Sequence, residues 1–380
     1  MDIKLLLRLM AERSASDLFF STGAPPHMKI EGVSTPMGQG PLPPGAIKEI
    51  AYKLMDEQQI QEFEEEWESN FAISVEDIGR FRVNVFMQRG EVGMVMRHIK
   101  SDIPTLESLN LPDPLKELVM GRSGLVLVCG PTGSGKSTSL AAMIDYRNNR
   151  DTSHILTIED PIEFIHPHKM SIIDQREIGV DTKNFHNALK NAMREAPDLI
   201  LIGEIRDQAA MEYALSYAQT GHLCLATIHG NNSKQVLERI RNLFPADMRA
   251  NVMMELSSVL NGIVSQRLVR SKSGQRVAAH EILLKAPDIV EIIQKGLLED
   301  LRKAIEAHHQ DGMMTFDQCL FKLYKQRIIT REDALHFAES KTDLNLKMRL
   351  AESGGKAPAA APGAPKKPSN GNGPSFKTKL

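Results

Sequence analysis

Short strand-like and helix-like patterns alternate over the first hundred residues. Residues 80–86 alternate apolar with polar side chains, as a half-buried strand does. A turn at 88–91 that contains Gly90 leads into a second such run at 92–99, so the two runs predict a β-hairpin. The other elements expected here are helices over 1–10 and 46–66 and strands over 17–20 and 27–30.

Predominantly apolar runs mark the rest of the chain. Those at 125–129, 154–158, 199–202 and 223–228 each end abruptly in polar residues, and helical patterns at 184–195 and 209–220 separate the last two pairs. Strands that are apolar throughout are buried on both faces, which is typical of a mostly parallel sheet covered by helices. Ligands bind such sheets at the carboxyl ends of the strands.

The remaining patterns predict further helices, one strand and a tail. Helices are expected over 231–243 and 250–267, with Asn231 or Asn232 capping the first, and a strand over 277–284. Capping boxes begin at Thr315 and Thr330, so a small helical unit follows. From residue 353 the chain is rich in Pro, Gly and Lys, which favours a flexible or solubilising tail over a basic binding arm.

These boundaries divide the chain into five parts. Asp113 is expected to be an N-cap, with Pro114 at the first helical position, so a helix begins at the end of a linker. The expected parts are an N-terminal α+β domain (1–103), a linker (104–114), an α/β core (115–285), a C-terminal helical subdomain (286–350) and a disordered tail (351–380).

Composition narrows the class of protein. The 46 Lys and Arg against 48 Asp and Glu give a net charge of -2, so no overall charge draws the protein to nucleic acid or anionic lipid. The three cysteines, Cys129, Cys224 and Cys319, lie far apart and form neither a disulfide framework nor a zinc motif. No apolar run reaches the ~18 to 20 residues of a membrane-spanning helix. We expect a reduced, cytoplasmic protein without direct membrane insertion.

Residues 130–138 carry the clearest chemistry. They read Gly-Pro-Thr-Gly-Ser-Gly-Lys-Ser-Thr and follow the first apolar run, which is the context of a P-loop. Glycines let backbone N–H groups turn toward phosphate oxygens, Lys136 reaches the β- and γ-phosphates, and the Ser137 hydroxyl is a ligand for Mg2+. The predicted nucleotide-binding residues are Gly130, Pro131, Thr132, Gly133, Ser134, Gly135, Lys136, Ser137 and Thr138.

Acidic residues follow two other strands and supply the remaining parts of a phosphoryl-transfer site. Glu204 follows 199–202 and is a candidate to hold Mg2+ through a water. Glu163 is a candidate to activate the attacking water, although Glu159, itself a tentative Mg2+ ligand, and Asp160 compete for either role. Without the P-loop, the same carboxylates would be explained as helix caps in a solvated loop.

Histidines and arginines complete the candidate site. His229 and His222 bracket the last strand and are candidate sensors of the γ-phosphate, although lone histidines often only complete a core or a turn. The nucleotide edge itself lacks an obvious arginine finger. Arg82 and Arg97, or Arg194 and Arg206, would reach the site from another subunit or by domain closure, unless the first two are merely solvated.

Taken together, four motifs resemble the type II/IV secretion ATPases. Within that superfamily the chain is similar to the retraction ATPases of type IV pili, the PilT/PilU branch, over about residues 1–345. The motifs are the P-loop, Ile-Glu-Asp-Pro-Ile-Glu (158–163), Ile-Gly-Glu-Ile-Arg-Asp (202–207) and the stretch from Thr220-Gly221-His222 to His229; supporting segments lie at 16–18, 79–84, 174–177 and 279–282.

The resemblance implies a hexameric ring of RecA-like P-loop ATPase domains with smaller PAS-like N-terminal domains. Such a ring hydrolyses ATP at subunit interfaces to disassemble a pilus fibre. Arg82 and Arg97 match arginines that the N-terminal domain carries toward the phosphates, Glu163 matches the glutamate credited with activating water, and Glu204 matches the Walker B glutamate. The implied partners are a PilT-like ATPase and an inner-membrane platform protein, with the ring docked peripherally at the pilus base.

Three departures favour the PilU-like side of the branch, and one of them is the extra Lys- and Pro-rich tail. PilT-like chains carry Ala-Ile-Arg-Asn-Leu-Ile-Arg-Glu where residues 288–295 read Asp-Ile-Val-Glu-Ile-Ile-Gln-Lys, and they carry a histidine where this chain has Phe19. PilU-like proteins are regarded as accessories to the main retraction motor, so an accessory role is expected. The intact P-loop and glutamates favour hydrolysis over an adaptor that only binds nucleotide. The neutral charge and 5% aromatic content argue against a helicase.

Overall fold

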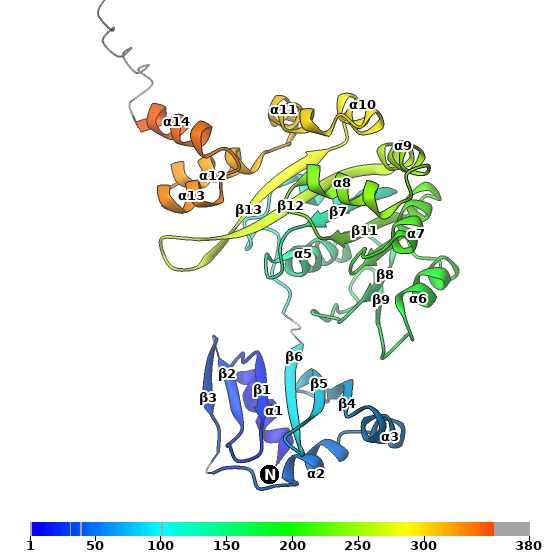
Figure 1. Ribbon diagram of the computed structural model, residues 1–380, viewed down its shortest axis with the longest axis vertical. Helices are drawn as coiled ribbons and strands as arrows, with labels where there is room; N and C mark the ends of the chain where they lie inside the picture. Colours follow the sequence, from blue (N-terminus) through cyan, green and yellow to red (C-terminus); the bar gives the residue numbers. More distant parts are fainter. Residues whose placement is uncertain (1, 31, 39, 100–101, 353–380) are drawn as a thin grey trace, which may run out of the picture.

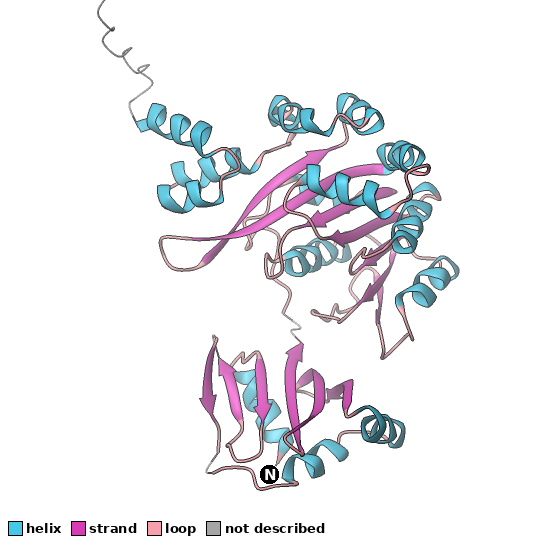
Figure 2. Cartoon of the chain, viewed as in Figure 1, coloured by secondary structure: helices cyan, strands magenta, loops and turns pink. Residues whose placement is uncertain are grey.

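The computed structural model describes residues 2–30, 32–38, 40–99 and 102–352, and every structural statement below concerns these residues. Figure 1 shows a smaller N-terminal body and a larger body that holds the other elements. Both contain helices and strands (Figure 2), so the predicted α/β class is confirmed. Residues 353–380, nearly all of the predicted tail, lie outside the described residues, while residues 351–352 belong to the last helix.

The N-terminal body is an antiparallel sheet packed against helices. Its strand order is β3-β2-β1-β6-β5-β4. Buried side chains such as Leu7, Phe20 and Phe81 form its core. The elements are α1 (Ile3–Glu12), β1 (Asp17–Phe20), β2 (His27–Ile30), β3 (Val33–Pro36), α2 (Ala46–Tyr52), α3 (Glu57–Glu66), β4 (Glu68–Val75), β5 (Gly79–Gln88) and β6 (Glu91–Ile99).

The predicted hairpin is confirmed, whereas the helix predicted over 46–66 is wrong. Arg89 and Gly90 both have positive φ, which matches the two-residue turn that joins antiparallel strands such as β5 and β6. The single expected helix is instead two, α2 and α3. Asp56 starts α3 because its side chain accepts the Gln59 backbone N–H and the Gln59 side chain caps it in return.

A seven-stranded sheet organises the larger body, in the order β13-β12-β7-β11-β10-β8-β9. All neighbours are parallel except β12 and β13, so the prediction of a mostly parallel sheet is confirmed. The strands are β7 (Gly124–Cys129), β8 (His154–Glu159), β9 (Ile172–Glu177), β10 (Leu199–Ile202), β11 (Leu223–Ile228), β12 (Leu260–Arg270) and β13 (Arg276–Leu284).

Helices cover both faces of this sheet. They are α4 (Pro114–Val119), α5 (Lys136–Asn148), α6 (Phe185–Ala192), α7 (Gln208–Gln219), α8 (Ser233–Leu243), α9 (Arg249–Val259), α10 (Pro287–Lys295), α11 (Leu301–Ala307), α12 (Phe316–Lys325), α13 (Arg331–Phe337) and α14 (Lys341–Glu352), with short 3-10 turns at 193–195, 298–300 and 309–311.

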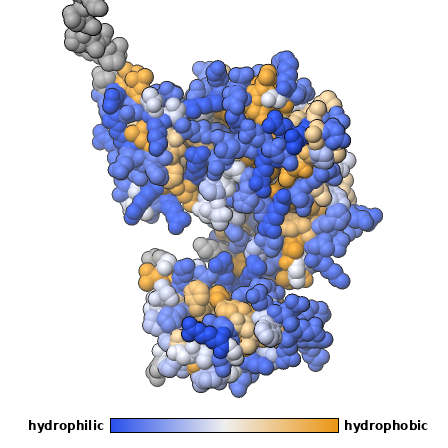
Figure 3. All heavy atoms as spheres, in the orientation of Figure 1, coloured by the Kyte–Doolittle hydropathy of each residue, from blue (hydrophilic) through white to orange (hydrophobic). Residues whose placement is uncertain are grey.

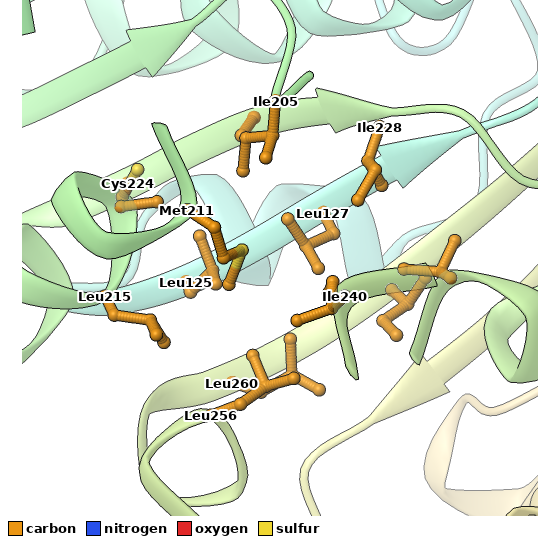
Figure 4. Close-up of a cluster of buried hydrophobic side chains, with 14 of the residues drawn as sticks. Leu125, Leu127, Ile205, Met211, Leu215, Cys224, Ile228, Ile240, Leu256 and Leu260 are labelled. Atoms are coloured by element: carbon orange, nitrogen blue, oxygen red, sulfur yellow. The ribbon is translucent and has the colours of Figure 1, made fainter. Parts of the chain in front are cut away.

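Alternate residues of β7 supply the two halves of the core. Leu125 and Leu127 belong to a cluster with Met211 and Ile240 from the helices on one face (Figure 4). Val126 and Val128 belong to a second cluster on the other face, together with side chains from α4 and α5. Burial on both faces therefore fixes the strand that ends at the P-loop.

Two predictions in this body need correction. The helix expected over 250–267 ends at Val259, and Leu260 begins β12, which is hydrogen-bonded on both sides and largely buried. A central strand satisfies its backbone through neighbours far away in sequence, which overrides local pattern. At the linker, α4 does begin with Pro114, but the Asp113 carboxylate accepts from Lys116 Nζ at 2.9 Å instead of capping the helix.

The C-terminal helices pack in two groups. Helices α10 and α11 share the main core with α9, whereas α12, α13 and α14 form their own cluster against β12 and β13. Thr315 and Gln318 make the predicted capping box, and Thr330 caps α13. Apolar residues show in several separate areas between hydrophilic ones on the visible surface (Figure 3). In the described part of the chain, no helix has both the length and the hydrophobicity to cross a bilayer.

Candidate active site

The phosphate loop joins β7 to α5 in a conformation that requires glycine. Gly130 has φ of 150°, and a Cβ there would lie 2.3 Å from the Gln266 carbonyl oxygen. Gly133 and Gly135 also have positive φ. The Lys136 ammonium donates to the carbonyl oxygens of Gly130 at 2.9 Å and Pro131 at 3.2 Å. The Lys136 side chain is therefore folded over its own loop. Burial lowers the pKa of Lys136, and the negative charges of Glu204 and Glu163 oppose that decrease.

A pocket of about 560 Å³ opens beside this loop, at the carboxyl ends of β8, β10 and β11. That volume lies in the roughly 300 to 1,000 Å³ range of small-molecule sites. Six predicted loop residues line it, namely Thr132, Gly133, Gly135, Lys136, Ser137 and Thr138. The pocket brings them together with four more predicted residues, Glu159, Glu163, Glu204 and His229, as expected from strand ends that meet at one edge.

Glu204 is the centre of a charged network in the pocket. Its Oε1 lies 2.5 Å from His229 Nε2, and its Oε2 accepts from Arg206 Nε at 2.6 Å. Arg206 also approaches Asp160, with 3.3 Å between nitrogen and oxygen. Because the Glu204 carboxylate stabilises the guanidinium, the pKa of Arg206 is raised. The network joins the ends of β8, β10 and β11.

Arg206 corrects one expectation. The sequence predicts no arginine finger at the nucleotide edge itself and an Arg206 that reaches the site from another subunit or by domain closure. Arg206 instead lines the pocket of its own chain. Arg194, the other candidate in this body, donates to Asn191 Oδ1 at 3.0 Å and does not line the pocket.

The three carboxylates after β8 have different surroundings. Glu159 Oε1 accepts from the Thr157 hydroxyl at 2.7 Å and from Gln175 Nε2 at 3.2 Å, and burial raises the pKa of Glu159 to about 7. Asp160 faces Arg206. Glu163 is exposed in the pocket, and no described residue makes a hydrogen bond or ion pair with its carboxylate. Of the three, Glu163 is therefore the one whose carboxylate is unpaired and available to a substrate.

His222 does not join the candidate site. It precedes β11, whereas His229 follows it, so the strand separates the two by about 20 Å at ~3.3 Å per residue. His222 Nδ1 lies 3.1 Å from the Thr220 hydroxyl and 3.3 Å from the Tyr217 carbonyl oxygen, at the opposite end of the sheet from the P-loop. Within one chain, the two histidines cannot sense the same phosphate.

Arg82 and Arg97 lie opposite each other on β5 and β6 of the N-terminal body. Arg97 Nε donates to the buried Asp17 carboxylate at 2.8 Å, and neither arginine lines the pocket of its own chain. Nearby Arg80 approaches Glu177 at the end of β9, 3.9 Å away. The two predicted arginines are therefore neighbours on the N-terminal sheet and lie outside the pocket of their own chain.

Several pocket residues carried no signal in the sequence. Phe164, His166 and Phe185 line the pocket beyond the carboxylates. Burial lowers the pKa of His166 to about 4, so its ring is neutral at pH 7, and its buried Nδ1 has no hydrogen-bond partner. Residues 160–171 lie between strands and follow no periodic pattern, so only the fold brings these side chains to the pocket.

The chain matches known proteins over nearly all of its length. The model of the family described as "Type II/IV secretion system protein" matches residues 6–344. The Type IV pilus ATPase PilU of Pseudomonas aeruginosa is 51% identical over 92% of both chains. The Type IV pilus retractation ATPase PilT of the same organism is 42% identical over 88% of this chain and 97% of PilT.

A solved structure matches in three dimensions. The crystal structure of the pilus retraction motor PilT with bound ADP superposes with a TM-score of 0.86 at 41% identity, over 91% of this chain and 99% of that one. The match confirms the expected fold, in which a P-loop ATPase core follows a smaller N-terminal domain.

Proposed function

This chain belongs to the type II/IV secretion system protein family, and from that membership we propose that it is an ATPase of type IV pilus retraction. It hydrolyses ATP in a homo-hexameric ring and assists twitching motility as an accessory to a principal, PilT-like retraction ATPase. The observation that carries the proposal is one pocket that holds both the phosphate loop and the Glu204–His229 pair. Bound ADP in the PilT structure supports nucleotide use.

The residues of this chain divide the work of hydrolysis. Backbone N–H groups of the loop and Lys136 bind the phosphates, and the unpaired Glu163 orients and deprotonates the attacking water. His229, held by Glu204, donates a hydrogen bond to the γ-phosphate. The Ser137 hydroxyl and the Glu204 carboxylate are hard oxygen donors of the kind that Mg2+ binds, with Glu159 a further candidate. Mg2+ held there would neutralise charge that develops on the phosphates.

Helix α10 supports the accessory role. It carries the stretch at 288–295 that lacks the two arginines of PilT-like chains. Ile289 and Ile293 are buried, while Asp288 and Glu291 give the outer side acidic groups. A surface without those arginines, on which Glu291 pairs with Lys295, suits a different partner, and we place the ring, with a PilT-like ATPase, at a platform protein of the inner membrane. The alternative is an adaptor that binds nucleotide without needing to hydrolyse it.

The first test measures turnover and mass together. Purified protein is expected to hydrolyse ATP in the presence of Mg2+ and to have a mass in solution near six times the 42.3 kDa of one chain. Steady-state phosphate release and light scattering give the two values. A well-formed ring without turnover, alone or with an added PilT-like ATPase, would contradict the hydrolytic function and favour the adaptor.

We further propose that Arg82 and Arg97 act on the nucleotide of a neighbouring subunit. Their position on the N-terminal body, outside the pocket of their own chain, is consistent with this role. Arg82→Ala subunits, which lack the arginine, are expected to regain part of their lost activity when mixed with Lys136→Ala subunits, which cannot hold phosphate. Because an arginine finger contributes ~10^3 to 10^5 in rate, activity restored at even a small fraction of the subunit interfaces in the mixture is measurable. Mixtures no faster than either variant alone would count against action across an interface.

A further inference from the structure

The side chain of Gln175, on β9, holds the loop that carries Glu163. Its Oε1 accepts the backbone N–H of His166 at 2.8 Å, and its Nε2 donates to the carbonyl oxygen of Phe164 at 2.9 Å. The same Nε2 donates to Glu159 Oε1 at 3.2 Å. Gln175 therefore contacts the chain on both sides of Glu163. It bonds to Glu159, four residues before Glu163, and to Phe164 and His166, one and three residues after it.

These contacts fix which way the amide points. A backbone N–H needs an acceptor and a carbonyl needs a donor, so exchanging the oxygen and nitrogen of Gln175 would lose both backbone bonds. The half-buried side chain thus acts as a two-way bridge between β9 and the loop. Neither glutamate nor a hydrophobic residue of the same length can make both bonds.

The loop needs such a bridge because residues 160–171 contain no helix or strand. Its far half is held by buried Asn148 at the end of α5, which accepts from the N–H groups of Lys169 and Ser171 and donates to the Pro167 carbonyl. None of these three residues adjoins Glu163. The Gln175 side chain, in contrast, holds the residue directly after the candidate base.

The end of β9 adds electrostatic contact on the other side of Glu163. Glu177 lies two residues after Gln175 and is buried. Burial raises the pKa of Glu177, and the guanidinium groups of Arg80 and Arg82 and the backbone N–H of Ile162 oppose that rise. The strand thus faces the loop at Ile162 as well as at Phe164, the two neighbours of Glu163.

We infer that Gln175 is a positioning residue for Glu163, an inference that rests on the proposed ATPase function. Gln175 does not line the pocket, and it reaches the site through the loop and through its bond to Glu159. A general base must lie within hydrogen-bond reach of the water it activates, and misplacement by about 1 Å can cost ~100-fold in rate. Loss of the bridge should therefore slow hydrolysis and leave nucleotide binding by residues 130–138 intact.

The test compares three variants in the full-length protein. Gln175→Leu removes every hydrogen bond of the bridge, and Gln175→Glu keeps the acceptor but loses the donors. Asp174→Asn is the matched control, because Asp174 is the adjacent exposed residue and contacts only His154 at the surface. Steady-state kcat and KM for ATP, the Kd of a fluorescent ADP analogue and the thermal unfolding midpoint are measured for each.

We expect Gln175→Leu to lower kcat about 10- to 100-fold, with KM and the Kd for ADP within about twofold of the wild type. Gln175→Glu should also lower kcat, because it loses both donor bonds and sets a second carboxylate beside Glu159, and Asp174→Asn should match the wild type. If Gln175→Leu does not fold, the kcat and nucleotide affinity of Gln175→Glu are compared with those of the wild type instead. In single-turnover assays, Gln175→Leu should cause no further loss in a Glu163→Gln background, because the bridge acts through Glu163.

Three results would overturn the inference. They are an unchanged kcat, a parallel loss of kcat and nucleotide affinity, and an equal loss with and without the Glu163 carboxylate. Each leaves wild-type turnover intact and so leaves the proposed function standing. Absence of turnover in the wild type itself, alone and with a PilT-like ATPase, would overturn both.

Discussion

Replacing Glu204 with alanine is expected to lower the rate of ATP hydrolysis at least about 100-fold, the cost of removing one preorganised electrostatic group from an active site. The carboxylate joins His229 and Arg206, each within 2.6 Å of one of its oxygens. Its loss removes the proposed acidic ligand for Mg2+ and frees both partners to move. Steady-state phosphate release at saturating ATP measures the effect.

Two controls separate hydrolysis from binding. Glu212→Ala removes an exposed glutamate of α7 that only accepts from Gln208, and it should keep full activity. Lys136→Ala should lose nucleotide affinity, whereas Glu204→Ala should still bind ADP. Activity of Glu204→Ala within about threefold of the wild type would remove Glu204 from the catalytic machinery.

The sequence located this site well because the ends of parallel strands carry it. β10 and β11 have the bounds that their apolar runs predicted, and Glu204 and His229 follow them directly. The same rule also places His222, since a residue before a parallel strand lies at the opposite edge from one after it. The grouping of His222 with His229 neglected the length of the intervening strand.

The two missed strands of the larger body show where local pattern fails. β9 is an edge strand of the sheet and reads Ile-Ile-Asp-Gln-Arg-Glu, which has too many polar residues for a buried run. Two of these polar side chains, Gln175 and Glu177, bond to the neighbouring loop. β12 mixes apolar and polar residues, as the helix before it does, and pairing with β7 and β13 makes it a strand. Such long-range pairing has no signature in a short window of sequence.

The competition among three carboxylates, left open by the sequence, can be decided by neutralising each in turn. Glu163→Gln is expected to lower kcat about 100-fold or more, since a positioned general base contributes ~10² to 10^4 in rate. Glutamine keeps the volume and cannot take a proton. Nucleotide affinity should persist or increase, because the variant removes a negative charge that faces Lys136.

The surroundings of the other two carboxylates predict smaller effects. Glu159→Gln keeps an oxygen that can accept from the Thr157 hydroxyl, and burial already raises the pKa of Glu159 to about 7, so much of the wild-type protein is uncharged there at neutral pH. Asp160→Asn weakens one 3.3 Å contact with Arg206, which retains Glu204. Both should keep kcat within about tenfold of the wild type, whereas a base must lose far more.

Single-turnover hydrolysis by the three variants, with ADP affinity measured in parallel, makes the assignment. If Glu159→Gln or Asp160→Asn falls as far as Glu163→Gln with binding intact, that residue shares or replaces the role of Glu163. If only Glu163→Gln falls, the base is the one carboxylate of the three without a hydrogen-bond or ion-pair partner in the described chain. A free carboxylate is chemically suited to the task, because no neighbouring donor competes with the attacking water for its oxygens.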